Sequence, residues 1–176
     1  MPDLFLRAKE VCLLMKKFAR LVSIYRRKEA SMQGKTMITK VMAYITRFNE
    51  PYTELLVCEH RDYPEAGVQV PAGTVEEGET IEEALYREVK EESGLMEFLS
   101  VTKLKTYVYH HEGKNQYHER HVFHLEVQEE TAERWEYKVN SEGEDAGLIF
   151  FYYWVPVGAV PKLAANQDDC INQLFV

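Results

Sequence analysis

The sequence predicts a mixed α/β fold in which strands both precede and follow one central helix. Three observations support this fold class. Apolar residues fall at or near alternate positions in several short runs, as in strands with one buried face. An acidic helical pattern occupies the middle of the chain, and a second helix is expected near its end, over residues 166–175. This order favours layers of helix and sheet around one core.

The strands before the helix are predicted from apolar runs and from the turns that separate them. Apolar residues fall near alternate positions in 36–48, and residues 49–51 then form a turn. Residues 54–60 contain a continuous apolar run, which indicates a more buried strand. Residues 67–70 form a short strand-like run that leads into a glycine-bounded loop over 73–78. We therefore expect three strands ahead of the helix.

The strands after the helix begin with a predicted hairpin. Residues 102–111 and 117–127 have strand composition, and the turn between them lies around Gly113. Residues 136–139 and 147–155 add further strands, separated by an acidic turn. A loop marked by prolines follows, ahead of the expected final helix.

The central helix is predicted between Gly78 and Gly94, where Gly94 stands at the expected C-cap position. Its buried stripe consists of Ile81, Ala84, Leu85 and Val89. At about 100° per residue, Glu88 and Glu92 lie inside that stripe and Glu91 lies at its edge. A glutamate-rich helix is usually a solvated surface, and like charges at this spacing repel. Because lone charges are seldom buried without a partner or a metal, we interpret the three glutamates as lining a cleft.

The segment around this helix matches the pattern of a known family. Residues 73–95 read GTVEEGETIEEALYREVKEESGL. They fill every fixed position of G-x5-E-x7-R-E-U-x-E-E-x-G-U, in which U is aliphatic. The matching residues are Gly73, Glu79, Arg87, Glu88, Val89, Glu91, Glu92, Gly94 and Leu95. The segment therefore resembles a complete Nudix box, and the number of defined positions makes the match specific.

The resemblance implies a fold, a reaction and a cofactor. The fold would be an α/β/α sandwich with a mixed β-sheet, in a domain spanning residues 35–176. The enzyme would be a pyrophosphohydrolase that cleaves a nucleoside diphosphate linked to another moiety. The cofactor would be Mg²⁺ or Mn²⁺, which bind oxygen ligands and neutralise phosphate charge. No narrower substrate is predicted.

The resemblance also implies roles for single residues. Glu88, Glu91 and Glu92 would bind the metal, and the carbonyl of Gly73 would be a further ligand. Glu91 or Glu92 would orient or deprotonate the attacking water, which makes them the candidate catalytic acids and bases.

Two further roles complete the implied site. Arg87 would be catalytic by holding the glutamates in position, with Glu79 as its structural partner. Many members of the family also use an acid from a downstream loop. The candidates in this chain are Glu129, Glu130, Glu133, Glu142 and Glu144.

Length and composition are those of an ordinary globular protein. The chain of 176 residues favours one domain with a substantial core, at 45% hydrophobic and 28% charged residues. No apolar run is long enough to span a membrane. The net charge of −8 argues against DNA binding. Three separated cysteines, Cys12, Cys58 and Cys170, favour reduced thiols and a cytoplasmic location.

Residues 1–34 are predicted to form a basic amphipathic helix followed by a linker. Residues 1–30 carry eight Lys or Arg and three acids. A heptad spacing relates Leu4, Ala8, Val11, Met15, Phe18, Val22 and Tyr25. Three interpretations stay open. The helix packs on its own domain or on a second copy in a homodimer, it binds an anionic membrane or RNA, or the natural start is Met32 or Met37.

The hairpin over 102–127 contains five of the six histidines. His111 and His118 are expected to face each other, either as a metal or phosphate site or as an ordinary polar surface. His118 and Arg120 share one strand face by the period of two. If that face opens on the cleft, Arg120 is the candidate contact for a substrate phosphate.

Two other functions fit the same resemblance. A catalytically silent Nudix module would sense a nucleotide, but the intact set of Glu88, Glu91 and Glu92 argues against it. A pyrophosphohydrolase acting on an RNA cap or 5′ end would use the basic N-terminal segment, but the acidic main domain argues against that. The expected partner is a small nucleotide substrate.

Overall fold

The computed structural model of the chain describes residues 37–141 and 146–175. The helix and linker predicted over residues 1–34 lie outside this part, as do Glu142 and Glu144. Within the described part, a seven-stranded sheet carries one α-helix, α2 (Ile81–Ser93). No helix there is both long and apolar enough to cross a membrane.

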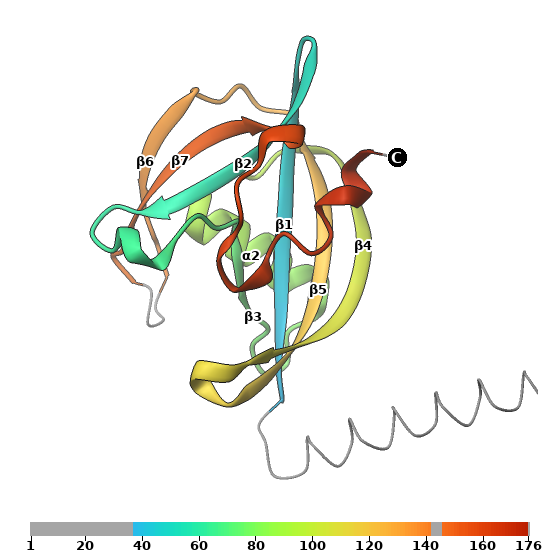
Figure 1. The fold of residues 1–176 in the computed structure, drawn as a ribbon, viewed down its shortest axis with the longest axis vertical. Helices are drawn as coiled ribbons and strands as arrows, with labels where there is room; N and C mark the ends of the chain where they lie inside the picture. Colours follow the sequence, from blue (N-terminus) through green and yellow to red (C-terminus); the bar gives the residue numbers. More distant parts are fainter. Residues whose placement is uncertain (1–36, 142–145, 176) are drawn as a thin grey trace, which may run out of the picture. The chain divides into compact units, whose positions relative to one another are not determined.

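The sheet is mixed, and β1 runs through its centre (Figure 1). Its strands are β1 (Met37–Asn49), β2 (Tyr52–His60), β3 (Ala72–Thr74), β4 (Phe98–His111), β5 (Gln116–Val127), β6 (Arg134–Lys138) and β7 (Ile149–Pro156). Their order is β4-β5-β1-β2-β7-β6, and β3 pairs with the first half of β1. The pair of β1 and β5 is parallel, whereas the other pairs are antiparallel. The predicted mixed α/β class is confirmed.

The central helix forms as the sequence predicts. Thr80 accepts a hydrogen bond from the amide of Glu83, and the Glu83 side chain accepts from the amide of Thr80, which completes a capping box. Gly94 ends the helix in the left-handed conformation, with φ of 80°. The buried positions of α2 are Ala84, Leu85, Val89, Glu92 and Ser93. Of the three glutamates, Glu92 is therefore the one that lies fully within the buried stripe.

The expected strand over 67–70 is wrong. Only Gln69 forms a bridge, with Cys58 of β2, and the regular strand β3 begins later, at Ala72. The amide of Val70 donates to the side-chain oxygen of Gln167 at 2.9 Å. Because that amide is bonded to a side chain, the pairing with β2 does not extend beyond Gln69.

The helix expected over 166–175 is also wrong. The chain there forms two short 3-10 turns, Ala164–Asn166 and Ile171–Phe175. The hydroxyl of Tyr44 donates to the carbonyl of Gln167 and accepts from the amide of Cys170. These bonds to a buried side chain of β1 replace bonds that an α-helix would make within the segment.

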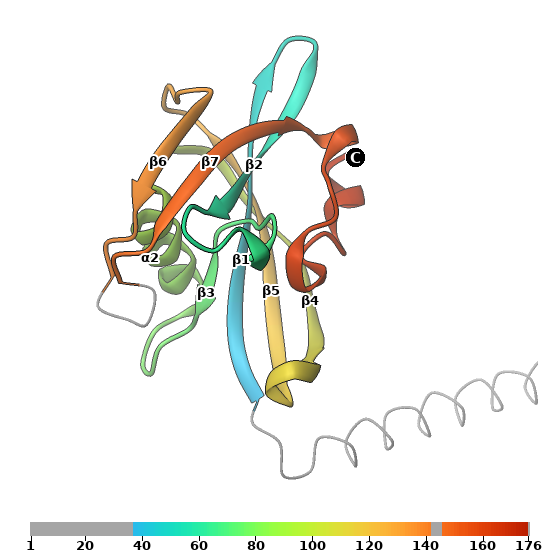
Figure 2. The same cartoon turned by 60° about the vertical axis from the view of Figure 1, so that its left-hand side comes forward.

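Each face of the sheet has its own hydrophobic core. The core on the α2 face includes Val41, Ala43, Ile45, Ala84, Leu85 and Val89. The core on the opposite face includes Met42, Tyr44, Leu55, Val57, Leu163 and Cys170. Figure 2 shows α2 on one side of the sheet and the segment after β7 on the other. In the described part, therefore, 3-10 turns and extended chain take the place of the second helical layer of the expected α/β/α sandwich.

Candidate active site

Gly73 lies where β3 meets the acidic helix. It pairs with Val41 of β1, and the carboxylate of Glu88 lies directly against it. A Cβ on residue 73 would lie 1.7 Å from the carboxyl carbon of Glu88 and 1.9 and 2.1 Å from its oxygens. Only glycine leaves room for this approach. The glycine that opens the motif thus permits a carboxylate to reach the backbone of β3.

Arg87 connects three carboxylates with β3. Its Nε and Nη2 donate to the two carboxylate oxygens of Glu79 at 2.7 and 2.8 Å. Its Nη1 lies 3.0 Å from Glu88 Oε1 and 3.3 Å from Glu91 Oε2. Its Nη2 also donates to the carbonyl of Thr74 at 2.9 Å. The guanidinium thereby holds together acids that would otherwise repel one another.

Glu92 lies deeper than the other acids of the motif, with 7% of its surface exposed. Its Oε2 accepts from the amide of Ala72 at 3.0 Å, and its carbonyl accepts from the hydroxyl of Tyr152 at 3.0 Å. Glu88 therefore contacts β3 at Gly73, and Glu92 contacts it at Ala72. Of the acids predicted from the motif, Glu79, Glu88 and Glu91 contact one guanidinium, whereas Glu92 contacts the neighbouring backbone of β3.

Burial and charge act in opposite directions on these groups. Burial raises the pKa of Glu88, although the neighbouring Arg87 opposes the rise. Hydrogen bonds from Arg87 lower the pKa of Glu79, and the same bonds raise the pKa of Arg87. Glu88 is thus a desolvated carboxylate whose charged form a further cation would stabilise.

A divalent cation fits the chemistry of this cluster. Within residues 37–141 and 146–175, no three His, Cys, Asp or Glu side chains are already gathered as a ligand set. The available donors are carboxylate oxygens and a backbone carbonyl, which Mg²⁺ prefers. Because Gly73 has no side chain, the Glu88 carboxylate lies against the backbone of β3. Arg87 pairs with Glu91 next to it. Gly73, Glu88, Glu91 and Glu92 stay the predicted ligands of the ion.

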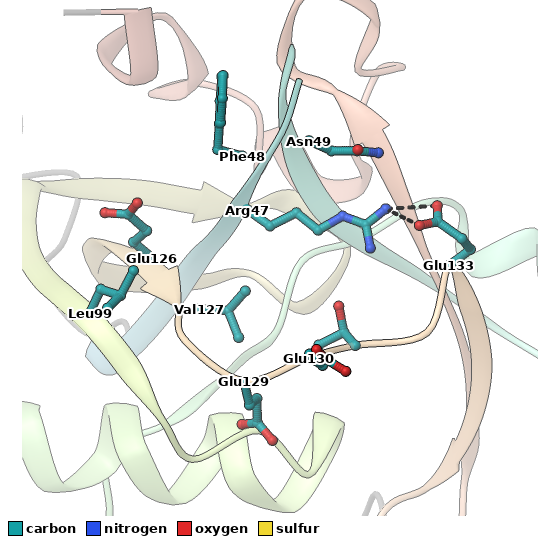
Figure 3. Close-up of a pocket in the computed structure, with 10 residues that line it drawn as sticks. Arg47, Phe48, Asn49, Leu99, Glu126, Val127, Glu129, Glu130 and Glu133 are labelled. Atoms are coloured by element: carbon teal, nitrogen blue, oxygen red, sulfur yellow. Dashed lines mark hydrogen bonds and ion pairs between the residues drawn. The ribbon is translucent and has the colours of Figure 1, made fainter. Parts of the chain in front are cut away.

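Three of the five downstream acids line a separate groove of about 450 Å³, shown in Figure 3. Glu133 pairs with Arg47 at 2.6 Å, and Glu129 accepts from the amides of Met96 and Glu97 at 2.9 and 3.2 Å. Glu130 lines the same groove. These contacts hold loops in place, and none of them involves the cluster around Arg87.

The groove lies toward the far end of β1 from Gly73. Gly73 pairs with Val41, whereas the groove is lined from Arg47 onward. Six residues of extended strand, at about 3.3 Å each, separate these positions by roughly 20 Å. The role of a downstream acid therefore stays a prediction, with Glu142 and Glu144 outside the described residues.

Arg120 is on β5, beside the first half of β1, and is 4% exposed. Its Nη1 donates to the carbonyl of Ala165 at 2.7 Å and to the hydroxyl of Tyr107 at 3.4 Å. Its guanidinium carbon lies 3.7 Å from the ring centre of Tyr109. Arg120 is therefore buried on the face of the sheet opposite α2, among aromatic rings.

The two hairpin histidines are neighbours but not direct cross-strand partners. His118 pairs with Tyr109, and His111 pairs with Gln116. The rings of His111 and His118 are nevertheless 5.6 Å apart, on a diagonal between the strands. The pair belongs to an aromatic cluster with Tyr109.

Lys40 is a candidate residue that the sequence analysis missed. It pairs with Thr74 of β3, its Nζ donates to the Thr74 hydroxyl, and its charge acts on Glu88. The available signal was a lysine directly before the buried run of β1, since a charge beside buried positions usually has a partner. Its place beside the acid cluster depends on the pairing of β1 with β3, which alternation alone does not specify.

Solved structures with the same fold come from several organisms. The Nudix domain of Shewanella oneidensis NrtR, complexed with ADP-ribose, is 16% identical, with a TM-score of 0.60 over 80% of this chain and 88% of that one. A MutT Nudix hydrolase from Burkholderia pseudomallei is 18% identical, with a TM-score of 0.59 over 80% and 99%. A C. elegans Ap4A hydrolase is 19% identical, with a TM-score of 0.53 over 78% and 95%.

No curated protein sequence matches the chain. The family model for the Nudix domain, however, matches residues 38–175, which include the whole sheet, α2 and the C-terminal turns. The match therefore extends far beyond the motif from which the resemblance was read. The chain belongs to the Nudix family.

Proposed function

We propose that the protein is a metal-dependent hydrolase that cleaves the pyrophosphate linkage of a nucleoside diphosphate joined to another moiety. The observation that carries the proposal is the cluster in which Arg87 bridges Glu79, Glu88 and Glu91 beside Gly73. A desolvated carboxylate next to other acids favours a cation, and a cation there would attract a phosphate. Membership of the Nudix family supports the same reaction.

Each residue of the cluster has a proposed task. Mg²⁺ or Mn²⁺, held by Gly73 and the three glutamates, would supply neutralisation of the phosphate oxygens. Glu91 is the better candidate to take a proton from the attacking water, because Glu92 is buried and bonded to the amide of Ala72. Arg87 keeps Glu91 and Glu88 in position.

The proposal is tested by neutralising one acid at a time. We expect Glu91→Gln to lower turnover by about 10²- to 10⁴-fold, as is usual when a general base is removed. Glu92→Gln should have an effect of similar size, because the metal would lose a ligand. The matched control is Glu82→Gln, an exposed acid of the same helix, which should leave turnover unchanged.

The substrates in that test should be nucleotide sugars, dinucleotides, cap analogues and nucleoside triphosphates, each with Mg²⁺, with Mn²⁺ and with chelator. Released phosphate or mononucleotide is the readout. Full activity in both glutamine variants, or in the presence of chelator, would contradict the proposed mechanism. Calorimetric titration of the folded protein with Mg²⁺ and nucleotide provides an independent measure of ion uptake.

A second candidate function is nucleotide binding without turnover. The observation that favours it is the similar fold of the NrtR Nudix domain, which was solved with ADP-ribose. The complete acid cluster favours hydrolysis instead. Tight binding of ADP-ribose together with no product from any compound of the panel would select the binding function.

A further inference from the structure

The last turn of α2, which carries Glu91 and Glu92, is bonded to the hairpin of β6 and β7. An α-helix leaves its final carbonyls without donors from its own backbone, and such ends fray unless other groups bond them. The carbonyl of Glu91 accepts from the amide of Asn140 at 3.0 Å. The carbonyl of Glu92 accepts from the hydroxyl of Tyr152 at 3.0 Å. A distant part of the chain therefore holds the backbone of two predicted metal ligands.

Tyr152 is a rigid anchor for this turn. It is fully buried, and its ring stacks on that of Trp135 with 5.2 Å between the ring centres. Tyr152 lies inside the sheet, where it pairs with Cys58 of β2 and with Trp135 of β6. Burial raises the pKa of Tyr152 well above its usual value, so the hydroxyl keeps its proton at neutral pH and stays a donor.

Glu92 is bonded to two different strands. Its carbonyl accepts from Tyr152 of β7, and its carboxylate accepts from the amide of Ala72 of β3 at 3.0 Å. Gly73, against which the Glu88 carboxylate lies, is the next residue of β3. Loss of the Tyr152 bond would free the backbone of the turn at Glu92. The positions of the carboxylates relative to one another thus depend on a bond made to the backbone of the helix.

The second tyrosine at this end of α2 bonds a different residue. The hydroxyl of Tyr137 donates to the carbonyl of Lys90 at 3.3 Å, and that carbonyl also accepts from the amide of Gly94 at 3.0 Å. Lys90 is not a predicted metal ligand, and its carbonyl already has a donor from the helix cap. Tyr152 is therefore the tyrosine on which the ligand-bearing turn depends.

We infer that Tyr152 is a positioning residue of the proposed hydrolase and that it raises the affinity for the metal by holding the last turn of α2. This inference rests on the proposed function. Replacing a group that orients metal ligands typically lowers metal affinity by about 10- to 100-fold. Because the Tyr152 hydroxyl bonds the helix backbone, its loss weakens metal binding and leaves the chemistry intact once the metal is bound.

The first test measures metal binding without substrate, by calorimetric titration of the folded protein with Mn²⁺ alone. We expect Tyr152→Phe to raise the Kd by about 10-fold or more. The matched control is Tyr153→Phe, which removes a hydroxyl from the next residue of the same strand. That hydroxyl donates to Glu59 at 2.6 Å, so the Kd should stay at the wild-type value. An unchanged Kd in Tyr152→Phe, or an equal rise in both variants, would overturn the inference.

The second test separates metal affinity from chemistry by measuring turnover of the best substrate against Mg²⁺ concentration. We expect Tyr152→Phe to need about 10-fold more Mg²⁺ for half-maximal turnover. At saturating Mg²⁺, kcat and KM should return to within about 3-fold of wild type, a difference on the order of RT. A kcat that stays low at saturating Mg²⁺ contradicts the inference.

The third test follows the anchor in the metal-free protein, through hydrogen exchange of the Asn140 amide. We expect about 10-fold faster exchange in Tyr152→Phe, because the turn that accepts this bond opens more often, and the wild-type rate in Tyr153→Phe. Equal rates in wild type and Tyr152→Phe argue against the anchor. If Tyr152→Phe does not fold, Asn140→Pro replaces it and removes the donor to Glu91. The same rise in the Kd for Mn²⁺ is then expected, and an unchanged Kd rejects the inference.

These tests also separate this inference from the proposed function. Mn²⁺ uptake with the same Kd in wild type and Tyr152→Phe would remove the positioning role and leave the hydrolase standing. Absence of Mn²⁺ uptake by the wild-type protein, with nucleotide or without it, would remove the proposed function and this inference together.

Discussion

At Gly73, the Glu88 carboxylate occupies the space in which any other residue would place its Cβ. We expect Gly73→Ala to displace Glu88, to lower the free energy of unfolding by about 1–3 kcal/mol and to remove most turnover. Urea denaturation and an assay of the best substrate measure the two effects. The control is Gly158→Ala, because nothing lies within 4 Å of a Cβ built there. Wild-type turnover in Gly73→Ala would show that catalysis does not need the close contact between the Glu88 carboxylate and residue 73.

The residues of the candidate site differ in how well the sequence predicts them. The contact between Glu79 and Arg87 is present as expected. The two residues are close in sequence, and one short loop and two helical turns set the distance between them. The neighbours of Arg120 are less predictable, because Ala165 reaches it from a distant segment through a left-handed turn. Lys40 was missed because strand pairing, and not strand formation, brings it to Thr74.

Among the elements, α2 has defined caps at both of its ends. Thr80 and Glu83 satisfy amides that would otherwise lack partners in the first turn. We expect Thr80→Ala to lower the free energy of unfolding by about 1 kcal/mol. Chemical denaturation measures this loss, with Glu82→Ala as the control because Glu82 is exposed and has no part in the capping box. A loss of the same size in both variants would show that the cap has no separate effect.

The elements also show where sequence patterns fail. A helix was expected over 166–175, yet the Tyr44 hydroxyl bonds the backbone of Gln167 and Cys170, and 3-10 turns form there instead. The strand-like run over 67–70 was expected to form a strand, yet the side chain of Gln167 accepts the hydrogen bond of the Val70 amide. Both failures involve a buried polar group from a distant part of the chain, which local propensity does not include.

For the whole molecule, the family match over 38–175 defines the part that should be sufficient for function. We expect a fragment of residues 35–176 to fold and to keep the turnover of the full chain within about 2-fold, which is a free-energy change near RT. Circular dichroism and the activity assay measure the two properties. Loss of folding in the fragment would show that residues 1–34 belong to the domain.

The same fragment tests the predicted homodimer. If the N-terminal heptads join two copies, size-exclusion chromatography should give a dimer for the full chain and a monomer for residues 35–176. An identical oligomeric state for both proteins would remove the N-terminal segment from the assembly.

The parallel pairing of β1 with β5 has a consequence for biosynthesis. It joins Met37 to Tyr117 and Thr46 to Glu126, partners that lie 80 residues apart. Pairing at such separation waits until the second strand has left the ribosome, and closing the intervening loop costs entropy. Until then, one edge of the apolar strand β1 has no neighbour, and an open edge recruits other chains. Nascent chains arrested before residue 116 should therefore be the species that aggregates and engages chaperones.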